Sequence, residues 1–157
     1  MPDFRPRPGG ATLVLDETET QLLRQLTAEL RALLTGSRAG NGPILNRLFP
    51  AVYDEPDNES AYRDLIGDDL TKEKLRALDT VSTSLADGST EVELTGEDFS
   101  TWLACLTDLR LALGVRLDVD EERMGAEIDP RDPNAQALTV LHWLGWLQEG
   151  LLRSLAS

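Results

Sequence analysis

Two side chains of this chain are candidates for covalent chemistry. Cys105 is the only cysteine and His142 the only histidine among the 157 residues. A cysteine nucleophile needs a neighbouring base or a helix N-terminus to lower the pKa of its thiol. Cys105 lies inside an apolar stretch, and His142 is flanked by Leu141 and Trp143. Both surroundings are typical of packed core residues, so we predict no enzyme, no catalytic residues and no cofactor.

Acidic residues raise the alternative of a metal site. The run Asp118-Val119-Asp120-Glu121-Glu122 resembles the start of a calcium-binding loop, but Arg123 and Asp129 occupy the sixth and twelfth positions. A calcium loop needs glycine and glutamate there, so the match fails. The glycine-rich segment 36–42 lacks the order and the lysine of a phosphate-binding loop. We therefore predict neither a metal site nor a nucleotide site.

The charge balance limits the classes of partner. The chain has 15 Lys and Arg against 28 Asp and Glu, which gives a net charge of −13. DNA affinity rests largely on neutralisation of phosphates by basic side chains, so nonspecific nucleic-acid binding by the whole surface is disfavoured. A single cysteine excludes a disulfide framework. With no apolar run of membrane length and no secretory signal, we expect a cytoplasmic protein that does not associate with membranes.

The apolar composition favours helices. The chain has 29 Leu against 7 Val and 3 Ile, and leucine is the better helix former. We predict a mainly α protein, a compact single-domain bundle of about five to six helices with one or two short strands. Residues 1–10 are expected to form a flexible N-terminal tail, and residues 11–157 the single helical domain.

Periodicity and capping residues place these elements along the chain. Asp16 is a good N-cap, Leu22, Leu26 and Leu30 form an apolar stripe, and Gly36 stops the helix. By the same reasoning we expect helices over 16–35, 58–66, 70–86, 97–113 and 134–155, with a turn or two over 44–50. Gly114 is expected to end or bend its helix. Alternation of polar and apolar residues predicts a strand over 90–95, and residues 11–15 form a second strand or extended lead-in.

Two runs of residues are more specific than this pattern. The first is Arg47-Leu48-Phe49-Pro50-Ala51-Val52-Tyr53-Asp54, and the second combines Trp102-Leu103 with residues 106–117, which read LTDLRLALGVRL. Together with Trp143-Leu144 and Leu147-Gln148-Glu149, they make most of residues 11–155 resemble the actinobacterial oxidative-stress regulator AosR family, formerly a domain of unknown function. The family-motif positions are Arg47, Leu48, Phe49, Pro50, Tyr53, Asp54, Trp102, Asp108, Arg110, Gly114, Arg116, Trp143 and Gln148.

The resemblance implies a cytoplasmic, non-enzymatic regulator of the oxidative-stress response, linked to transcription and cysteine metabolism. Members are also encoded beside the adaptor of the Clp protease, so an adaptor-like partner of the Clp system is an alternative. A thiol switch within one chain needs two cysteines. Cys105 is therefore a redox residue only through an intermolecular disulfide, a mixed disulfide with a small thiol, or sulfenic acid.

The charge favours docking on a protein over direct DNA binding. No helix carries several basic residues at the spacing of a recognition helix. An acidic regulator fits a sigma factor or RNA polymerase, whose DNA-binding surfaces are basic. We expect stretches 54–69 and 118–132, each with seven acidic residues, to contribute to docking. The alternative is a DNA-binding dimer whose basic cluster is drawn from Arg24, Arg31, Arg38 and Arg47.

Three aromatic and two charged side chains leave further alternatives open. Trp102, Trp143 and Trp146 belong either to the core alone or also to the surface of a homodimer or partner complex. Asp108 and Arg110 are two residues apart on one helix, so they do not pair with each other. Each is expected to bond a more distant group, with Arg110 or Arg116 bonding a carboxylate. Such a bond either specifies the fold or contacts a partner.

Overall fold

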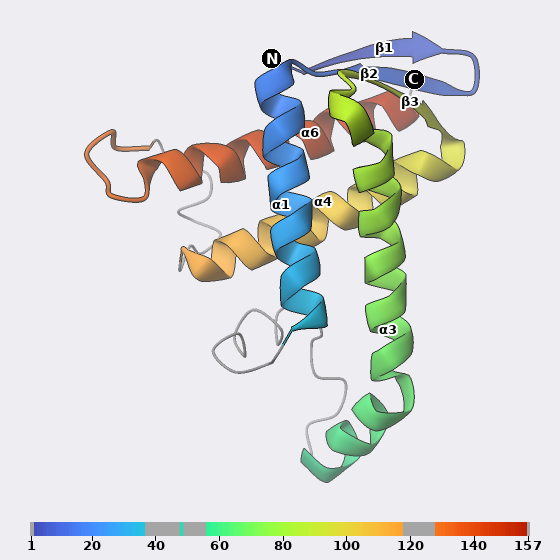
Figure 1. Cartoon of the computed structure of the whole chain (residues 1–157), viewed down its shortest axis with the longest axis vertical. Helices are drawn as coiled ribbons and strands as arrows, with labels where there is room; N and C mark the ends of the chain where they lie inside the picture. The colour runs from blue at the N-terminus through green and yellow to red at the C-terminus, as the bar shows by residue number, and fades with distance from the viewer. Residues whose placement is uncertain (1, 37–47, 49–55, 118–127, 157) are drawn as a thin grey trace.

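The computed structural model describes residues 2–36, 48, 56–117 and 128–156, with 56–69 described as backbone only (Figure 1). It is mainly α, as predicted. The described part contains four α-helices, one 3-10 turn and three strands. In chain order they are β1 (Asp3–Arg7), β2 (Gly10–Val14), α1 (Glu17–Thr35), α3 (Pro56–Ser84), η1 (Ala86–Gly88), β3 (Glu91–Thr95), α4 (Gly96–Arg116) and α6 (Ala135–Ala156).

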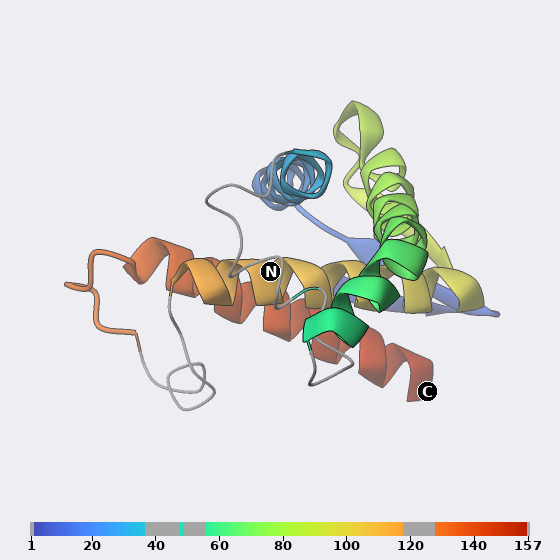
Figure 2. The same ribbon diagram turned by 90° about the horizontal axis from the view of Figure 1, so that it is seen from below.

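The helices form two crossed layers. Figures 1 and 2 show α1 and α3 side by side and antiparallel in one layer, and α4 and α6 side by side and antiparallel in the other. Hydrogen bonds hold the first layer together: Ser82 Oγ donates to Thr27 Oγ1 over 3.2 Å, and Thr20 Oγ1 donates to the carbonyl of Ser89 over 3.1 Å. Helix α4 lies at the centre of the described structure, where it contacts α1, α3, α6 and β3.

The apolar faces of the two layers meet in one core. Leu23 of α1, Leu78 of α3, Trp102 of α4 and Leu147 of α6 are each at most 2% exposed. One face of the sheet joins the same core through Ala11, Leu13, Val92 and Leu94. Burial of this leucine-rich surface is the main stabilising contribution to the fold.

The sheet is antiparallel throughout, in the order β1-β2-β3. Pro8 and Gly9 make the two-residue connection from β1 to β2, with Gly9 at φ +77°. Proline followed by a glycine of positive φ is the pattern of a type II turn. Phe4 of β1 packs so closely on α6 that a Cβ at Gly150 would lie 2.2 Å from its ring. The hairpin is therefore anchored to the last helix.

Local capping explains where two helices begin. The Asp16 carboxylate accepts from the Glu19 N–H over 2.7 Å, and the Glu19 carboxylate accepts from the Asp16 N–H over 3.1 Å. Thr95 and Asp98 make the same reciprocal arrangement at the start of α4. Each capping box satisfies amides that a helix start leaves without intrahelical partners. The predicted start of the first helix at Asp16 and its end at Gly36 are confirmed.

The predicted helix and strand counts need correction. Instead of two helices over 58–66 and 70–86, the structure has the single 29-residue helix α3. Gly67 does not interrupt it, since a glycine inside a helix costs only about 1 kcal/mol. Helix α4 likewise continues through Gly114 to Arg116. Of the predicted turn over 44–50, only Leu48 is described, and it is buried.

The predicted flexible tail is also wrong for part of its length. Asp3–Arg7, expected in the tail, form β1 and pair with β2, so the described part has three strands instead of one or two. Pairing across the Pro8-Gly9 turn and the contact of Phe4 with α6 order these residues. No helix in the described parts of the chain is both long and apolar enough to cross a membrane.

Candidate functional site

The charged motif residues of α4 each reach a different helix. Asp108 accepts from Lys74 Nζ of α3 over 3.0 and 3.1 Å. Arg110 Nη1 donates to the Gln148 side chain of α6 over 2.5 Å. Arg116 Nη1 lies 3.9 Å from a Glu29 carboxylate oxygen of α1. Through these three residues, helix α4 has a polar link to each of the three other described helices.

The Asp108–Lys74 pair is the most buried of these links. Asp108 is 8% exposed. Burial raises the pKa of its carboxyl above the usual range, and the charge and hydrogen bonds of Lys74 lower it only in part. Desolvation therefore outweighs the attraction of the lysine. Such a pair fixes the register of two helices more than it adds to stability.

Of the two arginines expected to bond a carboxylate, Arg116 reaches one at Glu29, whereas Arg110 bonds the side-chain amide of Gln148. Gln148 accepts from Arg110 through its side-chain oxygen and donates through Nε2 to Thr107 Oγ1 over 2.8 Å. A Cβ at Gly145 would lie 3.3 Å from the guanidinium carbon, so glycine allows Arg110 to pack on the backbone of α6. The buried Arg110 Nε has no hydrogen-bond partner among the described residues. The motif residues Arg110 and Gln148 thus meet, although 38 positions separate them.

The motif tryptophans lie at the interface between the two layers. Trp102 is 1% exposed, and its Nε1 has no partner in the described part of the chain. Trp143 Nε1 donates to Glu19 Oε2 over 2.9 Å, which links α6 to the capping box of α1. Gly114 faces open space, and nothing in the structure requires a glycine there.

Several predicted site residues lie outside the described residues. These are the motif positions Arg47, Phe49, Pro50, Tyr53 and Asp54. The two acidic stretches are described only in part: 56–69 as backbone of α3, and 128–132 with side chains. In that second part, Asp129 and Arg131 are exposed and pair with each other over 3.5 Å. Leu48 is the one described residue of the first motif.

Cys105 belongs to the core. Its side chain is 1% exposed, and burial together with the nearby Asp108 carboxylate raises the pKa of its thiol to about 12. His142 is half-buried, and its Nε2 has no hydrogen-bond partner among the described residues. The structure therefore offers Cys105 no base through that nitrogen. In the part of the chain that the structure describes, no group of three or more His, Cys, Asp or Glu side chains could hold a metal ion.

We expect Cys105 to react with iodoacetamide at least about 100-fold more slowly in the folded protein than in the unfolded chain at pH 8. The thiolate is the reactive form, and a pKa near 12 leaves very little of it, while burial blocks access. The measurement compares labelling rates with and without denaturant, by mass spectrometry. Equal rates would mean that the thiol is accessible in the folded protein. Cys105 would then again be a candidate redox residue.

The comparisons with known proteins now identify the family. Residues 1–155 match the family described as Domain of unknown function (DUF2017). The chain belongs to the DUF2017 family. The AosR protein of Mycobacterium leprae (strain TN) is 32% identical over an aligned length of 143 residues, and the match covers 78% of this chain and 65% of that protein. The oxidative stress regulator AosR of Mycobacterium tuberculosis (strain H37Rv) is 29% identical over an aligned length of 154 residues, and the match covers 88% of this chain and 70% of that protein.

These relatives are longer than the matched region. The DUF2017 chain spans just under two thirds of the first relative and 70% of the second. An oxidative stress regulator AosR of Mycobacterium bovis matches to the same extent, at 29% identity over 154 residues. No solved structure matches the chain significantly. The identities with these relatives confirm the resemblance to the AosR family at the level of sequence.

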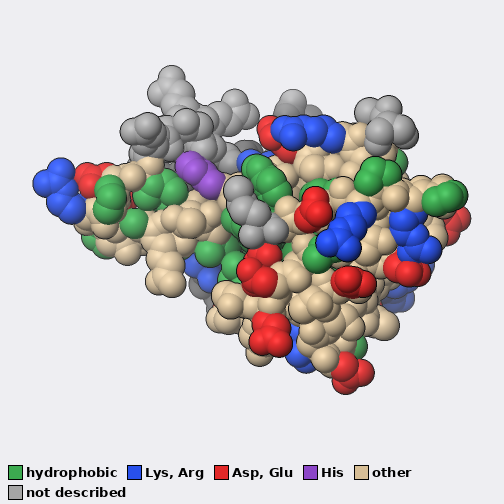
Figure 3. Space-filling view, turned by 90° about the horizontal axis from the view of Figure 1, so that it is seen from above, with side chains coloured by type: hydrophobic (Ala, Val, Ile, Leu, Met, Phe, Trp, Pro, Cys, Tyr) green, Lys and Arg blue, Asp and Glu red, His purple; other side chains and the backbone are tan. Residues whose placement is uncertain are grey.

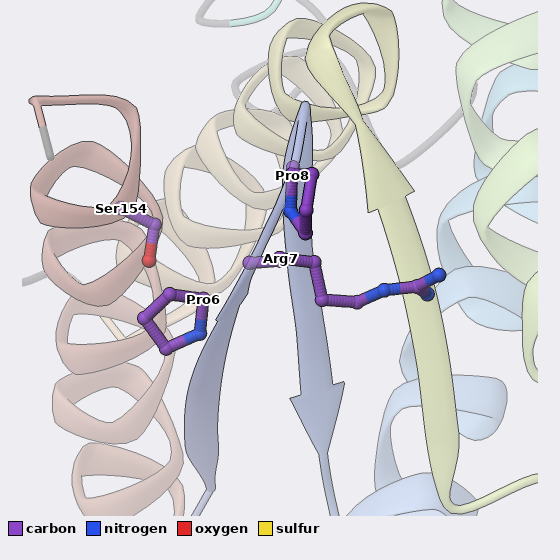
Figure 4. A pocket seen from close by; sticks show the side chains of 6 residues that line it. Pro6, Arg7, Pro8 and Ser154 are labelled. Carbon is purple, nitrogen blue, oxygen red and sulfur yellow. The ribbon is translucent and has the colours of Figure 1, made fainter.

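Two surface grooves of this DUF2017 chain were not expected from sequence. One, of about 600 Å³, lies between α3 and α4 and is lined by small and polar side chains around the Lys74–Asp108 pair. The other lies between β1 and α6 and is lined by Phe4, Pro6 and the half-exposed Trp146. Figure 4 shows Pro6 facing Ser154 of α6, whereas Arg7 points the opposite way, toward β3. Both grooves need long-range packing that no local pattern reports.

The basic cluster of the DNA-binding alternative is described only in part. Arg24 and Arg31 are exposed on α1, and Arg31 is bonded to Asp79 of α3. Arg38 and Arg47 lie outside the described residues. On the face of the DUF2017 chain that Figure 3 shows, basic side chains lie beside acidic ones. The two described arginines therefore do not make a continuous basic patch by themselves.

Proposed function

We propose that this protein is a regulator of the oxidative-stress response that acts through contacts with another protein, a sigma factor or RNA polymerase. The observation that carries the regulatory part is the similarity to proteins named oxidative stress regulator AosR, at 29–32% identity over most of the chain. The net charge of −13 supports a basic protein partner, since it repels DNA and attracts DNA-binding surfaces.

The proposal includes no catalytic step. The polar contacts of α4 support this, because Asp108, Arg110 and Arg116 are each engaged with another helix. These contacts specify how the helices pack. The buried Cys105 further suggests that the oxidant signal reaches the complex by another route than oxidation of this chain.

Affinity capture from a lysate of the source organism tests the proposal. The bait is the purified protein, and nuclease treatment removes nucleic-acid bridges. We expect a sigma factor or RNA polymerase among the captured proteins, identified by mass spectrometry, with and without oxidant. Capture of proteins only without nuclease, and their loss after nuclease treatment, would favour the DNA-binding dimer instead. Capture of Clp components alone would favour the adaptor-like alternative.

Charge reversal in the second acidic stretch should weaken capture of that partner about tenfold or more. The variant combines Asp120→Lys with Glu122→Lys, which turns attraction to a basic surface into repulsion. The matched control combines Glu73→Lys with Glu149→Lys, two exposed glutamates on α3 and α6, and changes the net charge equally. Equal loss in both variants would show that only the total charge matters. Unchanged affinity in the first would remove this stretch as a docking surface.

A further inference from the structure

The two edges of the sheet differ in the backbone groups that they present. In an antiparallel pair, successive residues direct their N–H and C=O groups alternately toward one neighbouring strand and away from it. Arg7 and Gly10 flank the two-residue turn and face each other. Asp3, Arg5 and Arg7 therefore bond to β2, and Phe4 and Pro6 direct their backbone groups outward.

Prolines close the outer edge of β1. Pro6 occupies an outward position within β1, and Pro2 and Pro8 flank the strand at its two ends. A proline has no N–H group, so an added strand would find a donor only at Phe4. The side chains of Phe4 and Pro6 also pack against α6 at Gly150 and Ser154. An additional strand cannot pair along this edge.

The outer edge of β3 is open. The Leu15 N–H donates to the Thr90 carbonyl over 2.7 Å, so Thr90, Val92 and Leu94 direct their backbone groups toward β2. Glu91 and Glu93 direct theirs outward. Among the described residues the structure records no hydrogen bond for these four outward groups. The Thr95 N–H is already bonded to Asp98 over 2.8 Å, which closes the end of the edge.

The side chains along this edge are acidic and exposed. Glu91 and Glu93 project on the solvent face of the sheet. Arg7 Nη1 lies 2.7 Å from a Glu93 carboxylate oxygen, and the Glu93 side chain is still 73% exposed. Pairing of β3 with the β3 of a second copy would place these glutamates opposite one another, and like charges directly opposite are destabilising. The charge therefore favours a basic occupant over a second copy of the chain.

We propose that the outer edge of β3 binds an extended, basic segment of a partner protein as a fourth strand. The outward N–H and C=O groups of Glu91 and Glu93 pair with the segment backbone. Lysine or arginine at alternate positions of the segment lies beside the two glutamate side chains. The inference rests on the proposed function in one respect, that the chain acts by binding a protein. It does not need that protein to be a sigma factor.

A synthetic peptide tests the edge directly. The probe is an acetylated, fluorescein-labelled peptide in which lysine and valine alternate, and the comparison peptide replaces each lysine with glutamate. We expect salt-sensitive binding of the lysine peptide to the full chain by fluorescence anisotropy. We also expect slowed amide hydrogen exchange at Glu91 and Glu93, measured by NMR. Equal binding of both peptides, or binding without protection of these two amides, would overturn the proposal.

Two variants separate the backbone contribution from the charge contribution. Glu93→Pro removes an outward N–H but no bond to β2, and we expect about tenfold weaker peptide binding, as for loss of one well-made contact. Glu91→Lys with Glu93→Lys keeps the backbone, and we expect it to lose the lysine peptide and to bind the glutamate peptide. If Glu93→Pro does not fold, this lysine variant decides the question alone.

The control variant combines Glu73→Lys with Glu149→Lys and should bind the lysine peptide nearly as the unmodified protein does. If it loses as much affinity as the β3 lysine variant, the attraction is general and the β3 edge is not the site. Peptide binding at β3 without sigma factor or polymerase capture would keep this inference and reject the proposed partner. The reverse outcome would keep the proposed function and reject the edge.

Discussion

Lys74→Ala should lower the free energy of unfolding by about 3 kcal/mol, because it leaves the buried Asp108 carboxylate without its charged partner. Lys74 Nζ lies 3.0 and 3.1 Å from the two carboxylate oxygens of Asp108. The side chains of Lys74 and Asp108 are 22% and 12% exposed, so little water replaces the lysine. Urea unfolding followed by tryptophan fluorescence measures the loss, because Trp102 lies on the same helix as Asp108.

The double variant Lys74→Met with Asp108→Leu should be about as stable as the unmodified protein, or more stable. The raised pKa of Asp108 indicates that burial costs more than Lys74 returns, and apolar side chains of similar size avoid that cost. Lys72→Ala, at an exposed position two residues away, is the control for loss of a lysine. If Lys74→Ala destabilises no more than Lys72→Ala, the pair has no structural role.

Gly10→Ala should be the second large effect, with a loss of about 3 kcal/mol in the free energy of unfolding, at the upper end for overpacking. An alanine Cβ at this position would lie 1.8 Å from the Leu94 carbonyl oxygen and 2.9 Å from its carbon. These are backbone atoms of β3 and cannot rotate away. Leu94 is itself 3% exposed in the core, so β3 cannot move without disturbing the packing below it.

Gly9→Ala is the matched control for that substitution. Gly9 is the neighbouring residue and has φ +77°, and a Cβ there meets nothing within 4 Å. Its substitution carries only the strain of a left-handed conformation, about 1 kcal/mol. Thermal unfolding of both variants gives the comparison. Equal losses at the two positions would mean that the sheet accommodates the extra methyl group at Gly10.

The helix starts could be predicted because their causes are local. Asp16 and Glu19 are three residues apart, and that spacing alone predicts the capping box that the structure contains. The alternation in residues 90–95 likewise predicted β3. The predictions failed where tertiary packing overrode a weak local pattern in the sequence. Two helices were predicted over 58–66 and 70–86, but helix α3 runs through both ranges without a break.

The site depended on distant partners, and so it could be predicted only in part. The motif marked Asp108, Arg110 and Gln148 as unusual, and the two-residue spacing showed that Asp108 and Arg110 do not pair. Their actual partners are 34 and 38 positions away, at Lys74 and Gln148. No local periodicity reports which residues of two packed helices face each other. The amide partner of Arg110 also follows from Gly145, which lets the guanidinium approach α6.

The anchoring of Phe4 at Gly150 has a consequence for biosynthesis. The β1–β2 hairpin is translated before β3, which pairs with β2, and well before α6, against which Phe4 packs. Until then Phe4 and Leu13 have no lasting cover, and exposed apolar surface on a nascent chain favours aggregation. Completion of the fold is delayed until the last helix of the described structure is free to pack.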